Sequence, residues 1–190
     1  MQLIIHHYPQ VLSTNKTARE YLALGAPEGT VIMADEQTAG QGQFGRVWHS
    51  PPGNLYCSIL LTPSADMVPF YHQLGYVMAV ALQKALHEIL PTLPITLKYP
   101  NDILIEGKKI AGILIEVEEK TMIVGLGLNV HHAPLGLDQP TTSLQEYAGQ
   151  PLAVTDISQV VLRHLWHTYQ DWLNQKFPTI HQAWVQHSLP

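Results

Sequence analysis

The segment from Gln37 to Trp48 contains residue types that could do chemistry. It reads Gln-Thr-Ala-Gly-Gln-Gly-Gln-Phe-Gly-Arg-Val-Trp. Its three glycines are Gly40, Gly42 and Gly45. Glycines at this spacing let backbone N–H groups turn toward one anion. Arg46 would add a bidentate cation, and Trp48 a flat face for a purine. The segment therefore predicts a phosphate-binding loop, although a mobile surface loop would have the same composition.

Two lysine-bearing segments follow. In Lys98-Tyr-Pro-Asn101-Asp102, the carboxylate can ligate Mg²⁺ through oxygen, and the asparagine can hydrogen-bond a phosphate or a base. An ordinary turn is the alternative, because Pro-Asn-Asp is typical of turns. Farther on, Lys109 precedes Ile-Ala-Gly112, which places a charge at the mouth of a strand that a ligand can approach closely. The alternative for this lysine is a solvated turn charge.

The run Gly125-Leu-Gly127-Leu-Asn129 places two glycines inside an apolar stretch. Interior glycines weaken a strand, so they indicate that a ligand or another backbone comes close. A closely packed helix crossing would explain them equally well. Asn129, at the end of the run, could donate and accept hydrogen bonds along the edge of an adenine.

Helices and strands must position these segments. Apolar spacing of three and four residues predicts helices over 17–24, 68–90, 156–176 and 180–189, with Ser13, Thr14 and Asn15 as capping candidates for the first. Short β-prone runs predict strands over 30–34, 54–61, 95–99, 103–105, 110–117 and 121–130. The run over 121–130 is apolar throughout and should be central. Together these elements predict an α+β or α/β domain, a mixed sheet with flanking helices.

Composition excludes several classes of protein. The chain has 190 residues and a net charge of −5, which argues against nucleic acid as a partner. It shows no signal peptide, and its longest apolar stretch is too short to cross a membrane. The one cysteine, Cys57, rules out an internal disulfide and indicates a reducing compartment, so we expect a cytoplasmic protein. The eleven histidines include no set spaced like metal ligands, so no metal site is assigned.

Six motifs in order carry a resemblance to a known family. They are Ser13-Thr-Asn, Gln37-x-x-Gly-x-Gly-x-x-Gly-Arg-x-Trp-x-Ser-Pro, Asn54-Leu-Tyr-x-Ser, Lys98-x-Pro-Asn-Asp, Gly107-Lys-Lys-x-Ala-Gly-Ile-Leu and Gly125-x-Gly-x-Asn-Val. This set closely resembles the catalytic domain of biotin protein ligases over about residues 10–131. The resemblance implies the biotin/lipoate ligase catalytic fold, which is similar to class II aminoacyl-tRNA synthetases.

It also implies a two-step reaction. Biotin and ATP would give biotinyl-5′-AMP and pyrophosphate, with Mg²⁺ offsetting the repulsion between two anions. A lysine of a biotin carboxyl carrier protein would then take the biotinyl group.

Site residues follow from the same resemblance. The residues implied to bind biotin are Ser13, Thr14, Asn15, Gln37, Gln41, Gly42, Gln43, Lys109 and Gly112. Those implied to bind ATP are Gly40, Gly45, Arg46, Trp48, Asn101 and Asn129. Those implied to be catalytic are Lys109, Lys98, Asp102 and Arg46.

The chain departs from the family pattern in its loop and its length. Gln41 and Gln43 stand where the family usually has arginines, so we expect weaker retention of the adenylate. A helix-turn-helix segment and the usual C-terminal β-barrel are missing, so residues 1–190 read as a monofunctional catalytic domain. A homodimer is possible. The alternative functions are a lipoate-type acyl-adenylate ligase and a biotin-binding domain without activity.

Overall fold

A seven-stranded sheet forms the centre of the described chain, residues 3–189 of the computed structural model. Its strands are β1 (Ile4–Val11), β2 (Thr30–Gln37), β3 (Leu55–Leu61), β4 (Ile95–Lys98), β5 (Asp102–Ile105), β6 (Lys108–Glu118) and β7 (Thr121–Leu128). They lie in the order β1-β2-β3-β7-β6-β5-β4. β1 and β2 are parallel and the other neighbours are antiparallel, so the sheet is mixed.

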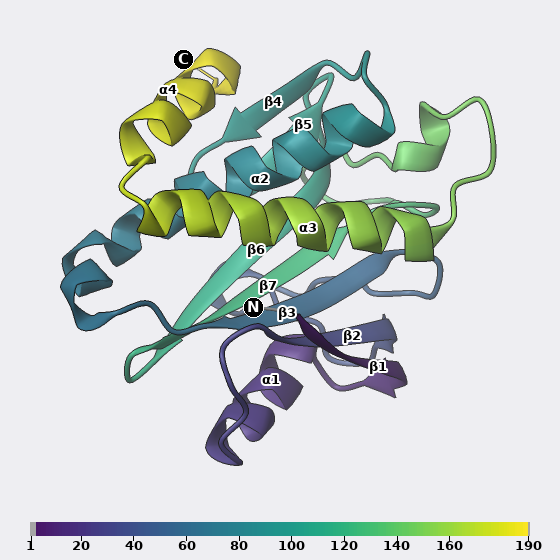
Figure 1. The fold of residues 1–190 in the computed structure, drawn as a ribbon. Helices are drawn as coiled ribbons and strands as arrows, with labels where there is room; N and C mark the ends of the chain where they lie inside the picture. The colour runs from purple at the N-terminus through teal and green to yellow at the C-terminus, as the bar shows by residue number, and fades with distance from the viewer. Residues whose placement is uncertain (1–2, 190) are drawn as a thin grey trace.

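Helices cover the two faces of this sheet unequally (Figure 1). The helices are α1 (Thr14–Ala23), α2 (Leu74–Ile89), α3 (Val154–Leu173) and α4 (Phe177–His187). α2 and α3 pack on one face and enclose most of the hydrophobic core, which includes Leu82, Val161 and Trp172. α1 packs on the other face through a small cluster centred on Ala18 and Ile32. Much of that second face is left without a covering helix.

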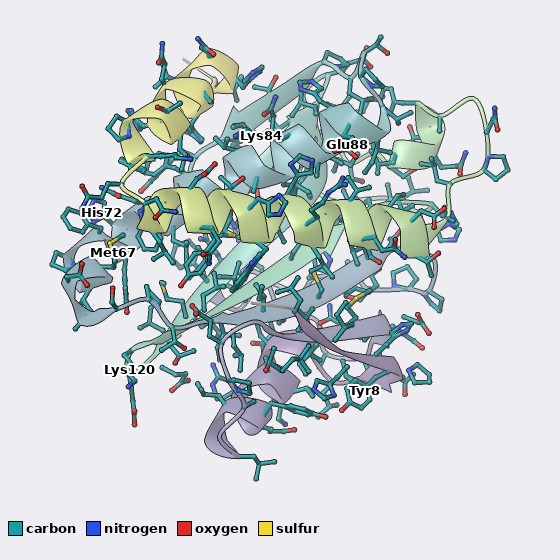
Figure 2. The ribbon with its side chains drawn as sticks, viewed as in Figure 1. Tyr8, Met67, His72, Lys84, Glu88 and Lys120 are labelled. Atoms are coloured by element: carbon teal, nitrogen blue, oxygen red, sulfur yellow. The ribbon has the colours of Figure 1, made fainter. Side chains whose placement is uncertain are left out.

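Polar side chains hold the outer layer together. Glu88 of α2 lies beside α3 (Figure 2) and accepts hydrogen bonds from Arg163 and His164. These bonds lower the pKa of Glu88, and the bond from His164 contributes more than the bond from Arg163. Lys120 lies at the turn between β6 and β7 (Figure 2), and its carbonyl accepts a hydrogen bond from Tyr71. The layers are thus tied by side chains at their rims and by apolar packing inside.

The predicted mixed sheet with flanking helices is confirmed, and so is the central place of the 121–130 run. The strand β1 was missed, because it lies at the sheet edge and its apolar residues are interrupted by two adjacent histidines and a proline, without the alternation that indicates a strand. The predicted helix over 68–90 begins as a 3-10 segment, η2 (Ala65–Gln73), and becomes α-helical at Leu74. Pro69 explains the break, since it removes a backbone donor and crowds the preceding turn. No helix of residues 3–189 is long and apolar enough to cross a bilayer.

Candidate functional site

A cavity of about 650 Å³ lies on the sheet face that carries α1. Five parts of the chain line it: the start of α1, the hairpin 41–49, the turn into β5, the strands β6 and β7, and the segment 134–141. Four of these parts are loops or a helix terminus, and the sheet gives them a rigid floor. A cleft of this size with convergent polar groups is the usual form of a small-molecule site.

The floor of the cavity is built by alternate residues of β7. Ile123 packs with Ala18 of α1, and the next residue on this face, Gly125, lies against Asn15. Gly127 lies beneath the ring of Trp48: a Cβ there would come 2.4 Å from Trp48 Nε1. The strand glycines therefore leave room for a helix start and an indole ring. The packed helix considered for them is therefore found at Gly125, whereas the close neighbour of Gly127 is an aromatic side chain.

Trp48, Lys109 and Asp102 meet above that floor. Lys109 Nζ lies 2.5 Å from Asp102 Oδ1 and 5.3 Å from the centre of the Trp48 ring. A bulge between β5 and β6 shifts the register next to Lys109, and bulges characteristically re-aim side chains at functional sites. The Asp102 oxygen is buried, and the Lys109 ammonium is its charged partner. The amine is thus held between a carboxylate and an aromatic face.

A second set of polar side chains surrounds the start of α1. Gln37 Oε1 accepts from the backbone N–H of Thr14 at 2.8 Å, so β2 caps this helix in place of a Ser13 side chain. Gln37 Nε2 donates to Ser50, which in turn donates to the carbonyl of Trp48. This chain of bonds ties the helix start to the base of the hairpin.

Ser58 of β3 completes this network from beneath. Its hydroxyl is fully buried and lies 2.7 Å from Thr14 Oγ1 and 2.6 Å from Asn15 Oδ1. Asn54, in the same motif, accepts from the backbone N–H groups of 130, 131 and 132. Sequence reasoning noted this motif but gave neither side chain a role. Both side chains position other residues through hydrogen bonds, and sequence spacing alone does not show such contacts.

The substitution Ser58→Ala tests the buried network. It leaves Asn15 Oδ1 without its donor, so we expect the free energy of unfolding to fall by about 1–3 kcal/mol. Urea denaturation would measure the change. Ser64→Ala is the matched control, because Ser64 is exposed and its side chain caps nothing. Equal midpoints for the two variants would contradict the assignment.

The structure brings most of the predicted site residues together. The cavity lining includes Ser13, Thr14, Asn15, Gln37, Gln41, Gly42, Gln43, Arg46, Trp48, Asn101, Asp102, Lys109, Gly112 and Asn129. It also includes residues that the sequence did not indicate: His49, Pro134, Leu137, Asp138, Gln139 and Thr141. The segment 134–141 is rich in proline and glycine, which is typical of a loop but does not indicate a cavity wall.

Three predicted residues do not line the cavity: Lys98, Gly40 and Gly45. Lys98 is exposed and pairs with Asp102 across the β4–β5 hairpin, so both side chains emerge on the same face of the sheet, but the lysine lies outside the cavity lining. Gly40 is buried beneath the hairpin, and a Cβ there would come 2.4 Å from the carbonyl of Trp48. Gly45 has a φ of +72°, which suits glycine at the hairpin tip. These two glycines shape the hairpin from outside the cavity lining.

Cys57 is a packed thiol without a disulfide partner. It is buried on the helix-covered face of β3, and burial raises its pKa to about 12. The unfolded thiol ionises near pH 9.0, so raising the pH from 9 toward 12 deprotonates the unfolded chain first and destabilises the fold. We expect Cys57 to react with Ellman's reagent at pH 8 only as fast as the chain opens, and rapidly in urea. A rapid reaction without urea would contradict this burial.

Comparisons with known proteins agree with this fold and site. The sequence profile of the Biotin/lipoate A/B protein ligase family matches residues 8–131. The match spans well over half of the chain, so the chain belongs to this family.

Among curated relatives, the "Bifunctional ligase/repressor BirA" of Bacillus subtilis (strain 168) is 36% identical over 99% of this chain and 60% of its own length. The "Biotin--[acetyl-CoA-carboxylase] ligase" of Mycobacterium tuberculosis is 33% identical over 87% of this chain and 64% of its own. The chain thus spans about three-fifths of these relatives.

Solved structures give the same picture. A biotin protein ligase from Aquifex aeolicus in complex with biotin and ATP superposes with a TM-score of 0.88 at 30% identity, over 98% of this chain and 78% of that one. The enzyme from Leishmania major in complex with biotinyl-5-AMP superposes with a TM-score of 0.78 at 27% identity, over 93% and 81%. These neighbours confirm the predicted catalytic fold.

Proposed function

We propose that this protein activates biotin with ATP to biotinyl-5′-AMP and transfers the biotinyl group to a lysine of a biotin carboxyl carrier protein. One observation supports this above the others. A single cavity joins the polar side chains at the start of α1 to the cluster of Trp48, Lys109 and Asp102. Hydrogen-bonding groups together with a fixed cation suit an elongated ligand that carries polar groups and negative charge. The neighbours named above hold biotin, ATP and biotinyl-5-AMP.

The first step joins two anions. A biotin carboxylate oxygen attacks the α-phosphorus of ATP; an oxygen–phosphorus bond forms, and the bond to the leaving pyrophosphate breaks. Lys109 and Arg46 are the lysine and arginine of the cavity lining. A cation held in place before the reaction stabilises the charge that develops in the transition state. Lys109 fits this role because Asp102 and Trp48 already fix its amine.

The second step needs a neutral amine and little water. The carrier lysine attacks the acyl carbon, an amide bond forms and AMP leaves. Asp102 lines the cavity and can orient that amine and accept its proton, once Lys109 is engaged by the phosphate. The hairpin 41–49 and the segment 134–141 flank the cavity, and closing them over the adenylate would exclude water.

Mg²⁺ fits this site as a companion of the nucleotide. Asp102 and Asp138 are the carboxylates of the lining, and no group of three or more metal-ligating side chains occurs within residues 3–189. Mg²⁺ commonly takes one or two carboxylates and completes its shell with phosphate oxygens and water. Either carboxylate would hold the ion, which would neutralise the phosphates.

Substitutions in the hairpin 41–49 test whether side-chain charge retains the biotinyl-AMP intermediate. Gln41 and Gln43 line the cavity where the family usually has arginines. We expect Gln41→Arg with Gln43→Arg to slow escape of biotinyl-AMP several-fold, because an added cation strengthens each contact with phosphate. Trapping released adenylate after rapid filtration would measure this. Unchanged escape would show that the backbone, and not side-chain charge, retains it.

Partner and location follow from the same chemistry. The carrier would be a carboxylase subunit that carries biotin, and the site of action would be the cytoplasm, where ATP and reduced thiols coexist. Homodimer formation is a further prediction.

Transfer of labelled biotin to a carrier domain tests the proposal. We expect label on the carrier only when ATP is present. Labelling with lipoate in place of biotin would favour the lipoate-type alternative, and binding of biotin without transfer would favour a domain without activity.

A further inference from the structure

We propose that Glu116, which lies outside the cavity lining, is a positioning residue that fixes the orientation of the Asn15 side-chain amide. The Asn15 end of the cavity then favours a ligand that presents a hydrogen-bond acceptor. The inference rests on the proposed function, because it assigns the ligand end that biotin's ureido group would occupy. Glu116 lies on β6, and Asn15 lies in the first turn of α1 against Gly125 of β7.

The bonds around Asn15 leave its amide one orientation. Asn15 Nδ2 donates to Glu116 Oε2 at 2.7 Å. A carboxylate only accepts, so the amino group and not the carbonyl must face Glu116. On the other side, Asn15 Oδ1 accepts a hydrogen bond from the buried hydroxyl of Ser58. The same oxygen packs against Gly125 so closely that a Cβ added to this glycine would lie 2.2 Å from it. The remaining amide hydrogen of Asn15 is therefore the group that it offers the cavity.

Arg19 fixes Glu116 in turn. Arg19 Nη2 donates to Glu116 Oε1 at 3.0 Å, while its Nε donates to Glu118 at 2.5 Å. The two oxygens of Glu116 thus serve two different donors, one on Arg19 and one on Asn15. A glutamine in this place has a single acceptor oxygen. Because bonds to a charged donor are the stronger ones, that oxygen would go to Arg19, and the amino group would face Asn15.

The consequence is a reversal of what Asn15 presents. In Glu116→Gln, Asn15 turns its oxygen toward residue 116, and the Ser58 hydroxyl can rotate to accept from Asn15 Nδ2. The cavity then loses a donor for the ureido carbonyl of biotin. The analogue 2-iminobiotin carries a protonated imino group, a donor, in place of that carbonyl, so it should not suffer from the change.

Calorimetric titration of the full chain with biotin and with 2-iminobiotin tests this. We expect Glu116→Gln to raise the Kd for biotin about tenfold or more, with the Kd for 2-iminobiotin unchanged or lower. Adding Arg19→Ala frees the glutamine oxygen for Asn15, so the double variant should regain part of the affinity for biotin. Glu118→Gln is the matched control, because Glu118 bonds Arg19 but not Asn15, and it should keep the wild-type ratio.

The outcomes separate the two proposals. Failure of the wild-type chain to bind biotin would overturn the proposed function. Binding of biotin by the wild type, with equal weakening of both ligands in Glu116→Gln, would overturn the role of Glu116 alone. Additive losses in the double variant would also contradict it.

Discussion

Lys109→Ala should reduce biotin-dependent ATP–pyrophosphate exchange by roughly 10²–10³-fold, which is the usual effect of removing one preorganised group that stabilises charge in a transition state. The lysine lies in the cavity, 2.5 Å from Asp102 and over the Trp48 ring. Its loss leaves Asp102 as an unpaired carboxylate near the incoming phosphates, which adds repulsion. Exchange of labelled pyrophosphate into ATP would measure the rate.

Two lysines nearby give matched controls. Lys108 precedes Lys109 but is exposed, and Lys98 is exposed on the adjacent hairpin outside the cavity. We expect Lys108→Ala and Lys98→Ala to change the exchange rate less than about threefold, as is usual for surface substitutions away from a site. A large loss in Lys98→Ala would restore the catalytic role that the sequence resemblance implied for it. A normal rate in Lys109→Ala would remove Lys109 from the mechanism.

Gly127→Ala should have the second largest effect. Its methyl group would lie 2.4 Å from two atoms of the Trp48 indole, so the ring must leave its place on β7. Displacing Trp48 removes a wall of the cavity and its contact with Lys109, and misplacements near 1 Å can cost about 10²-fold in rate. Overpacking should also lower the free energy of unfolding by about 1–3 kcal/mol.

Binding of biotin and of ATP, measured by calorimetry beside thermal melting, would test this variant. Gly149→Ala is the control, because no atom lies within 4 Å of a Cβ there and its backbone needs no left-handed φ. Unchanged affinity in Gly127→Ala would mean that the Trp48 ring is not part of the bound site.

The sequence predicted the elements with strong periodicity and missed the one without it. α2, α3 and β7 each bury a continuous apolar surface, so their patterns were visible. β1 has half-exposed residues and sits at the sheet edge, where neighbours and not its own residues decide its pairing. The order of strands could not be derived from local patterns, because it depends on contacts between distant segments.

The residues of the candidate site also differ in how far the sequence indicates them. Lys109, Trp48 and Asn15 were indicated by type and by motif, and the cavity contains all three. Lys98 was indicated by the same motif as Asp102 and emerges on the same face as this cross-strand partner, but its exposed side chain lies beyond the cavity lining, which a local pattern does not show. Ser58 and Glu116 act through other side chains. Their roles depend on distances that appear only in the folded chain.

The most direct test of the central claim is ATP–pyrophosphate exchange by the 190-residue chain with biotin, with lipoate and with neither acid. The account predicts exchange that requires biotin and falls to background in Lys109→Ala. Exchange supported by lipoate alone, or no exchange with biotin by a folded chain that binds ATP, would contradict it.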